Sequence, residues 1–83
     1  MMKQITYRAA ARKALRRMPA NMALRILSKI EDFARDPAAQ ANNIKALQGR
    51  EGIRLRVGDW RVIMLDGEVL DVLTIAARGS IYY

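Results

Sequence analysis

The 83-residue sequence predicts an α+β fold in which a hairpin of two helices packs on an antiparallel sheet. The hydrophobic period carries this prediction: apolar residues recur at helical spacing before Pro37 and alternate with polar residues from Gly52 onward. Two dipeptides, Gly58-Asp59 and Asp66-Gly67, are typical of two-residue hairpin turns. A hydrophobic content of 52% is typical of a folded chain.

The first half of the chain predicts a short opening strand at residues 2–6 and then two helices. In RAAARKALRRM, which runs from Arg8 to Met18, the apolar residues Ala11, Ala14, Leu15 and Met18 share one helical face. Pro19 ends this helix and can open the next, in which Ala23, Ile26, Leu27, Ile30 and Ala34 share a face. Asp36-Pro37 ends the second helix, and we expect DPAAQANN to form a loop.

The second half predicts three antiparallel strands at about residues 52–57, 60–65 and 68–77. If both turns are tight, Val57 lies opposite Trp60, Arg56 opposite Arg61, and Arg61 opposite Val72. The face toward the helices then contains Ile53, Leu55, Val57, Trp60, Val62, Met64, Val69, Leu73 and Ile75, with Asp71 as its acidic exception. The opposite face carries Arg54, Arg56 and Arg61 toward one end and an uncovered apolar group, Ile63, Leu65, Leu70 and Val72, toward the other.

The composition is basic and excludes several kinds of chemistry. Fifteen Lys and Arg residues against eight Asp and Glu give a net charge of +7, most of it in residues 1–36. This charge favours a polyanion, usually nucleic acid, although an acidic protein or an anionic membrane surface would also be attracted. Without Cys or His there is no disulfide, thiolate nucleophile, imidazole base or ordinary zinc site, and we expect no cofactor and no metal.

We expect residues 1–83 to form a single cytoplasmic domain that does not enter a membrane. No apolar run approaches the length of about 20 residues that spans a bilayer, and MMKQITYRAA lacks a signal-peptide apolar region.

The three arginines of the predicted hairpin converge, because Arg56 and Arg61 are cross-strand neighbours and Arg54 lies one pair along. Like charges directly opposite each other destabilise a sheet. Two interpretations remain open: a solvent-exposed sheet face that tolerates arginine, or a site where an anion relieves the repulsion.

Beyond these patterns, the chain resembles the RelE/ParE superfamily of bacterial type II toxins. The resemblance rests on RRMP, a helix ending in ARDP, IKALQGREGIRLRVGDWRVIM, the Asp-Gly hairpin and the closing VLTIAARGSIYY. It implies two helices against a four-stranded antiparallel sheet, and a cognate antitoxin protein that neutralises the toxin. In the RelE branch it implies metal-independent cleavage of messenger RNA (mRNA) in the ribosomal A site.

The resemblance also implies a catalytic set: Arg54, Arg61, Arg78 and Tyr82. Arginine stays protonated in proteins, so the three arginines are suited to stabilise developing charge, and Tyr82 is the candidate for proton exchange. Where some members carry a lysine two residues before Arg54, this chain has Gly52. Expected RNA contacts are Arg56, Lys45, Arg12, Lys13, Arg16 and Arg17, and the expected antitoxin contacts are Ile63, Leu65, Leu70 and Val72.

The sequence leaves three functions open. A ribosome-dependent endoribonuclease that inhibits translation is favoured by the joint presence of Arg54, Arg61, Arg78 and Tyr82. A ParE-like toxin that inhibits DNA gyrase without nuclease activity would have the same fold. A nucleic-acid-binding module that reads a groove with its β-ribbon is the third.

Overall fold

The computed structural model describes residues 2–79, and its sheet contains one strand more than expected. The elements are β1 (Ile5–Tyr7), α1 (Ala9–Arg17), α2 (Ala20–Arg35), the 3-10 helix η1 (Pro37–Asn43), β2 (Ile44–Ala46), β3 (Ile53–Val57), β4 (Trp60–Asp66) and β5 (Leu70–Ala77). The strand order is β1-β5-β4-β3-β2, with β1 parallel to β5 and the other pairs antiparallel. The α+β class is confirmed, but a five-stranded mixed sheet replaces the expected four antiparallel strands.

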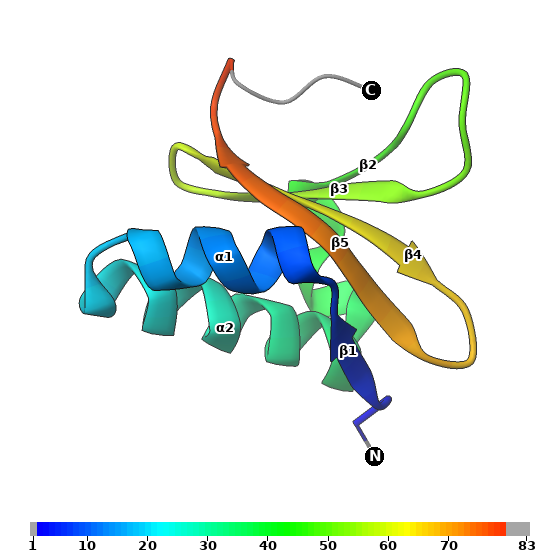
Figure 1. Ribbon diagram of the computed structural model, residues 1–83. Coiled ribbons are helices and arrows are strands. Elements are labelled where there is room, and N and C mark those ends of the chain that lie inside the picture. Colours follow the sequence, from blue (N-terminus) through cyan, green and yellow to red (C-terminus); the bar gives the residue numbers. More distant parts are fainter. Residues whose placement is uncertain (1, 80–83) are drawn as a thin grey trace.

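The two helices lie side by side over one face of the sheet (Figure 1). They are separated at Met18 and Pro19, as expected from the proline. α2 ends before Pro37, because a proline disfavours helical backbone in the preceding residue; Asp36 has φ −149° and ψ 86°. The predicted loop after it is the helix η1 instead. Neither α1 nor α2, nor any other helix in residues 2–79, has the length and apolar character needed to cross a membrane.

The core lies between the helices and the sheet and follows the two sequence periods. The helices contribute apolar residues at helical spacing, and the sheet contributes alternate residues of its strands. Its buried members are Ala11, Met18, Ile26, Ile30, Phe33, Ala34, Leu55, Val57, Val62, Met64, Leu70, Val72 and Ile75.

The predicted register of β3 and β4 is confirmed. Val57 lies opposite Trp60, and Arg56 lies opposite Arg61. The turn that joins Val57 to Trp60 contains only Gly58 and Asp59. Gly58 has φ +58°, a conformation that favours glycine.

The predicted register of β4 and β5 is wrong. Asp66 lies opposite Leu70, so three residues rather than two form the loop, and Gly67 does not adopt a positive φ. A bulge follows: Met64 lies opposite Val72 and Ile63 opposite Thr74, which leaves Leu73 unpaired in this register. Arg61 consequently lies opposite Ala76 rather than Val72.

This shift removes Leu70 and Val72 from the uncovered apolar group that the sequence predicted. A register shift by an odd number of residues moves side chains to the other face of a sheet, so Leu70 and Val72 enter the core with 0% exposure. Ile63 is 1% exposed and Leu65 is half-buried, whereas Val69, predicted to be in the core, is 36% exposed. The assignment of antitoxin binding to Ile63, Leu65, Leu70 and Val72 rested on their exposure, and of these four residues only Leu65 keeps exposed surface.

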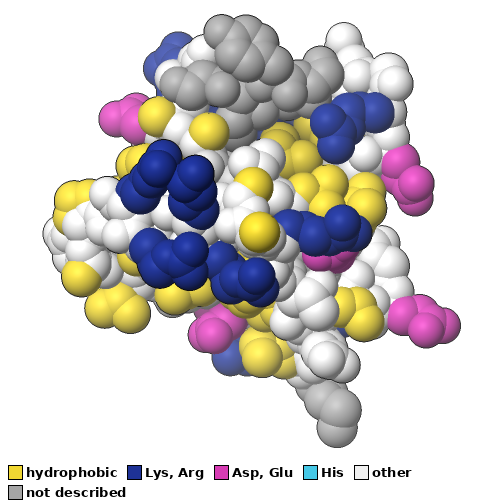
Figure 2. Space-filling model, viewed as in Figure 1, with side chains coloured by type: hydrophobic (Ala, Val, Ile, Leu, Met, Phe, Trp, Pro, Cys, Tyr) yellow, Lys and Arg dark blue, Asp and Glu magenta, His cyan; other side chains and the backbone are white. Residues whose placement is uncertain are grey.

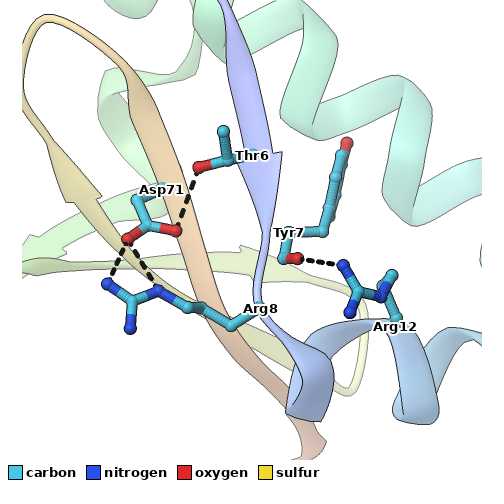
Figure 3. Close-up of polar contacts among 5 residues, drawn as sticks. All are labelled: Thr6, Tyr7, Arg8, Arg12 and Asp71. Carbon is cyan, nitrogen blue, oxygen red and sulfur yellow. Dashed lines mark hydrogen bonds and ion pairs between the residues drawn. The ribbon is translucent and has the colours of Figure 1, made fainter.

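An acidic side chain that the sequence placed in the core joins β5 to β1 instead (Figure 3). Asp71 accepts hydrogen bonds from Arg8 Nε at 3.0 Å and from Thr6 Oγ1 at 3.0 Å, and Arg8 Nη2 lies 2.8 Å from Asp71 Oδ2. The hydrogen bond from Arg8 lowers the pKa of Asp71, and the Thr6 hydroxyl and the charge of Arg8 act in the same direction, against the effect of burial. This network fastens the parallel edge strand to the sheet.

We predict that Asp71→Asn destabilises the fold at pH 7 and that this effect shrinks as the pH falls below about 4. The folded-state pKa of Asp71 is lowered, so its stabilisation is present above the unfolded pKa, about 4, and is lost as the pH falls through the folded pKa. Melting temperatures of parent and variant between pH 7 and pH 2 measure the difference. Glu51→Gln, at an exposed position, is the control. A gap between parent and Asp71→Asn that stays constant over this range contradicts the prediction.

We also predict that the two hairpin glycines differ in their tolerance of alanine. Gly58→Ala should lower the free energy of unfolding by about 1 kcal/mol, because a Cβ is strained at positive φ. Gly67→Ala should have a smaller effect, because its φ is not positive and its Cβ would lie 3.8 Å from the Val69 carbonyl oxygen, an ordinary contact. Urea denaturation of both variants tests this, and equal losses would contradict it.

Candidate nucleic-acid interface

The β3–β4 hairpin places its arginines on the sheet face opposite the helices. Leu55 and Val57 point into the core, so Arg54 and Arg56 between them point away from it. Arg61 lies opposite Arg56 and shares this side.

A recess of about 480 Å³ lies where the edge of β3 is open. β2 pairs only with residues 53–55, so no strand within residues 2–79 lies beyond the last two residues of β3. We call this space the edge recess. Among the described residues, five cations line it together with one acid, Asp59; the cations are Arg25, Lys29, Arg56, Arg61 and Arg78.

Neutral groups position the hairpin arginines in the edge recess. Arg56 Nη2 donates to Asn43 Oδ1 at 3.2 Å. Arg61 Nη1 donates to the carbonyl oxygens of Gly58 and Trp60, both at 3.0 Å. These contacts fix the guanidinium groups without cancelling their charge.

The backbone of Arg78 is also attached to the hairpin, because its N–H donates to the Asp59 carbonyl oxygen at 2.6 Å. This bond holds the end of β5 beside the β3–β4 turn. It explains how an arginine far along the chain reaches the same recess as Arg61.

A smaller recess of about 140 Å³ adjoins the first and shares Asn43, Arg56 and Arg61 with it. We call it the inner recess; its other lining residues are Asn42, Lys45 and Arg54. Lys45 lies opposite Arg54 in the β2–β3 pair. Five of the predicted site residues thus meet in two adjoining recesses: Arg54, Arg61, Arg78, Arg56 and Lys45. Tyr82 lies outside the described residues.

The predicted RNA contacts of α1 lie elsewhere. Arg12, Lys13, Arg16 and Arg17 are exposed, and Figure 2 shows basic side chains gathered over α1. None of them lines either basic recess. Arg12 also has a structural contact, since its Nη1 donates to the Tyr7 carbonyl oxygen at 2.9 Å (Figure 3).

Three polar residues of the edge recess were not predicted from the sequence: Arg25, Lys29 and Asn43. The spacing of Arg25 and Lys29, four residues apart, indicates a shared helical face. It does not indicate that this face meets the turn of a distant hairpin. Asn43 gave no signal, because its role follows from η1 ending beside Arg56.

Comparisons with known proteins identify the family. The chain matches the model of the ParE toxin of type II toxin–antitoxin systems over residues 5–82, and it belongs to this family. It is thus a toxin of the RelE/ParE superfamily. A comparison with curated protein sequences found no match.

Solved structures share the fold. The RelE–RelB complex from Pyrococcus horikoshii OT3 aligns with a TM-score of 0.79 and 24% identity, over 98% of this chain and 100% of that chain. RelBE2 from Mycobacterium tuberculosis gives a TM-score of 0.78 and 17% identity, over 94% and 100%. The intact E. coli RelBE complex gives a TM-score of 0.69 and 18% identity, over 95% and 99%.

Proposed function

We propose that this toxin is a ribosome-dependent endoribonuclease that cleaves mRNA in the A site and thereby inhibits translation in the cytoplasm. We take residues 1–83 as a single toxin domain whose reaction is metal-independent. The observation that carries the proposal is the convergence of Arg54, Arg61 and Arg78 on two adjoining recesses at one edge of the sheet.

Cleavage of RNA by its own 2′-hydroxyl needs three kinds of help. A group must accept the hydroxyl proton, charge must stabilise the phosphorane-like transition state, and the departing 5′-oxygen must be assisted. Arg61 suits the second role, because two carbonyl oxygens hold its guanidinium in place before substrate binds. Arg78 adds charge in the edge recess and Arg54 adds charge in the inner recess.

We assign proton exchange to Tyr82. Tyr7 is the only tyrosine within residues 2–79, and it lines neither basic recess. Burial, assisted by the charge of Glu31, raises the pKa of Tyr7, which is the wrong direction for a proton acceptor.

Arg56 and Lys45 are assigned to the RNA phosphates near the site, and the exposed cations of α1 to the ribosomal RNA backbone. Contacts with phosphates stabilise the complex of toxin, mRNA and ribosome, and they do not depend on the base sequence.

A cognate antitoxin is the proposed protein partner. Several solved structures with this fold are RelE–RelB complexes. A neutralising antitoxin segment would be acidic where it meets the recesses.

Inhibition of DNA gyrase is the second candidate, and the observation that favours it is the match to the ParE toxin model over residues 5–82. A gyrase inhibitor needs no RNA cleavage, so the two functions are separable. Loss of supercoiling by purified gyrase, together with intact mRNA on toxin-treated ribosomes, would assign the second function and reject the first.

We predict that Arg61→Ala lowers single-turnover cleavage on saturating, mRNA-programmed ribosomes by about 10²–10³-fold and leaves ribosome affinity nearly unchanged, because a preorganised donor acts on the transition state. Tyr82→Phe should resemble it. The double variant Lys13→Ala, Arg16→Ala should instead weaken ribosome affinity and leave single-turnover cleavage nearly unchanged. Phosphate contacts made equally in the ground and transition states affect binding and not the chemical step. Cleavage by Arg61→Ala and Tyr82→Phe within about threefold of the parent would contradict the assignment.

A further inference from the structure

α2 contributes two cations to the edge recess that have no role in the reaction described above. Arg25 and Lys29 lie four residues apart and so project from the same side of the helix. The guanidinium of Arg25 lies over the hairpin turn, since a Cβ placed on Gly58 would be 3.8 Å from Arg25 Nη1. Lys29 is half-buried in the same wall.

Within residues 2–79, the charge in this recess is offset only by the single acid Asp59. The ion pairs within residues 2–79 join Lys3 to Asp66, Arg8 to Asp71 and Arg35 to Asp32, and none involves a cation of the edge recess. Like charges four residues apart on a helix repel each other and destabilise it. A bound anion would turn this repulsion into attraction.

The lining favours a phosphate over a protein carboxylate. Besides the five cations and Asp59 it offers the Asn43 amide, and Val57 is its one apolar residue within residues 2–79. Protein partners are usually anchored by aromatic or aliphatic side chains in apolar pockets, which this recess lacks. Nucleic-acid backbones are held by guanidinium, ammonium and amide donors.

The edge recess is also continuous with the inner recess that contains Arg54, because the two share Asn43, Arg56 and Arg61. An extended polyanion that passes Arg61 along the open edge of β3 therefore reaches α2.

We propose that Arg25 and Lys29 form a second phosphate subsite, which binds a backbone phosphate of single-stranded RNA beside the phosphate held by Arg61. The identification of the ligand as RNA rests on the proposed function. The subsite contacts the strand equally in ground and transition states, so it contributes to binding rather than to the chemical step.

Binding of a short, fluorescein-labelled single-stranded RNA to the full chain, measured by anisotropy at several salt concentrations, tests the subsite. Arg25→Ala with Lys29→Ala should weaken binding about tenfold at low salt and make the slope of log K against log[salt] shallower by about 0.7, the value for one phosphate of a single strand. Arg25→Lys with Lys29→Arg keeps both charges and should bind like the parent.

The matched control is Arg35→Ala with Arg50→Ala, which removes the same charge from residues outside both basic recesses. It should leave the slope unchanged. Equal weakening by the two double alanine variants would overturn the proposal in favour of net charge alone, and no weakening by either would overturn it outright. Competition by poly-glutamate as effective as by RNA would reassign the recess to acidic protein.

Cleavage on programmed ribosomes separates this inference from the proposed function. The double substitution Arg25→Ala, Lys29→Ala should raise KM far more than it lowers kcat. Arg61→Ala should lower kcat and leave KM nearly unchanged. If the parent protein cleaves no mRNA, the proposed function fails while the anisotropy result still decides whether the subsite exists. A fall in kcat with KM unchanged would overturn the subsite as described.

Discussion

The register between β3 and β4 is the constraint on which the rest of the structure depends. The tight turn at Gly58 places Arg56 opposite Arg61, an arrangement that costs a few tenths of a kcal/mol to about 1 kcal/mol. The same register buries the side chains that alternate with these arginines, and each contributes about 1.5–3 kcal/mol. The free energy gained by burial exceeds the cost of the arginine repulsion, so the packing of the core holds the arginines together. A slip by one residue would bury the charges and expose the core.

Sequence patterns predicted the helices and this hairpin, because proline, glycine and hydrophobic period act locally there. They failed at β5, where the three-residue loop after Asp66 and the bulge at Leu73 each change the register. Alternation alone is consistent with either register, and only packing selects between them. The short strand β2 and the parallel pairing of β1 also gave no periodic signal, since three residues cannot establish a period.

The hairpin part of the site was predictable, whereas the contributions of α2 and η1 depend on tertiary packing. Gly52 occupies the position where some members of the superfamily carry a lysine. It has φ +127°, and a Cβ there would lie 3.0 Å from both the Leu47 side chain and the Met64 carbonyl oxygen. A lysine at this position would be strained on this backbone. The cation beside Arg54 comes instead from Lys45 on β2.

Arginine and lysine side chains have carboxylate partners in the fold but neutral partners in the candidate site. Away from the recesses, Asp71 pairs with Arg8 and Asp66 with Lys3, and these pairs fasten β1 and the β4–β5 loop. In the edge recess, carbonyl and amide oxygens hold Arg56 and Arg61 in place of carboxylates. A carboxylate partner would orient a guanidinium equally well but would cancel its field, whereas a neutral acceptor leaves the full charge directed at a ligand. Preorganisation and attraction for an anion are thereby obtained together, which is the requirement for stabilising a phosphate as its charge develops.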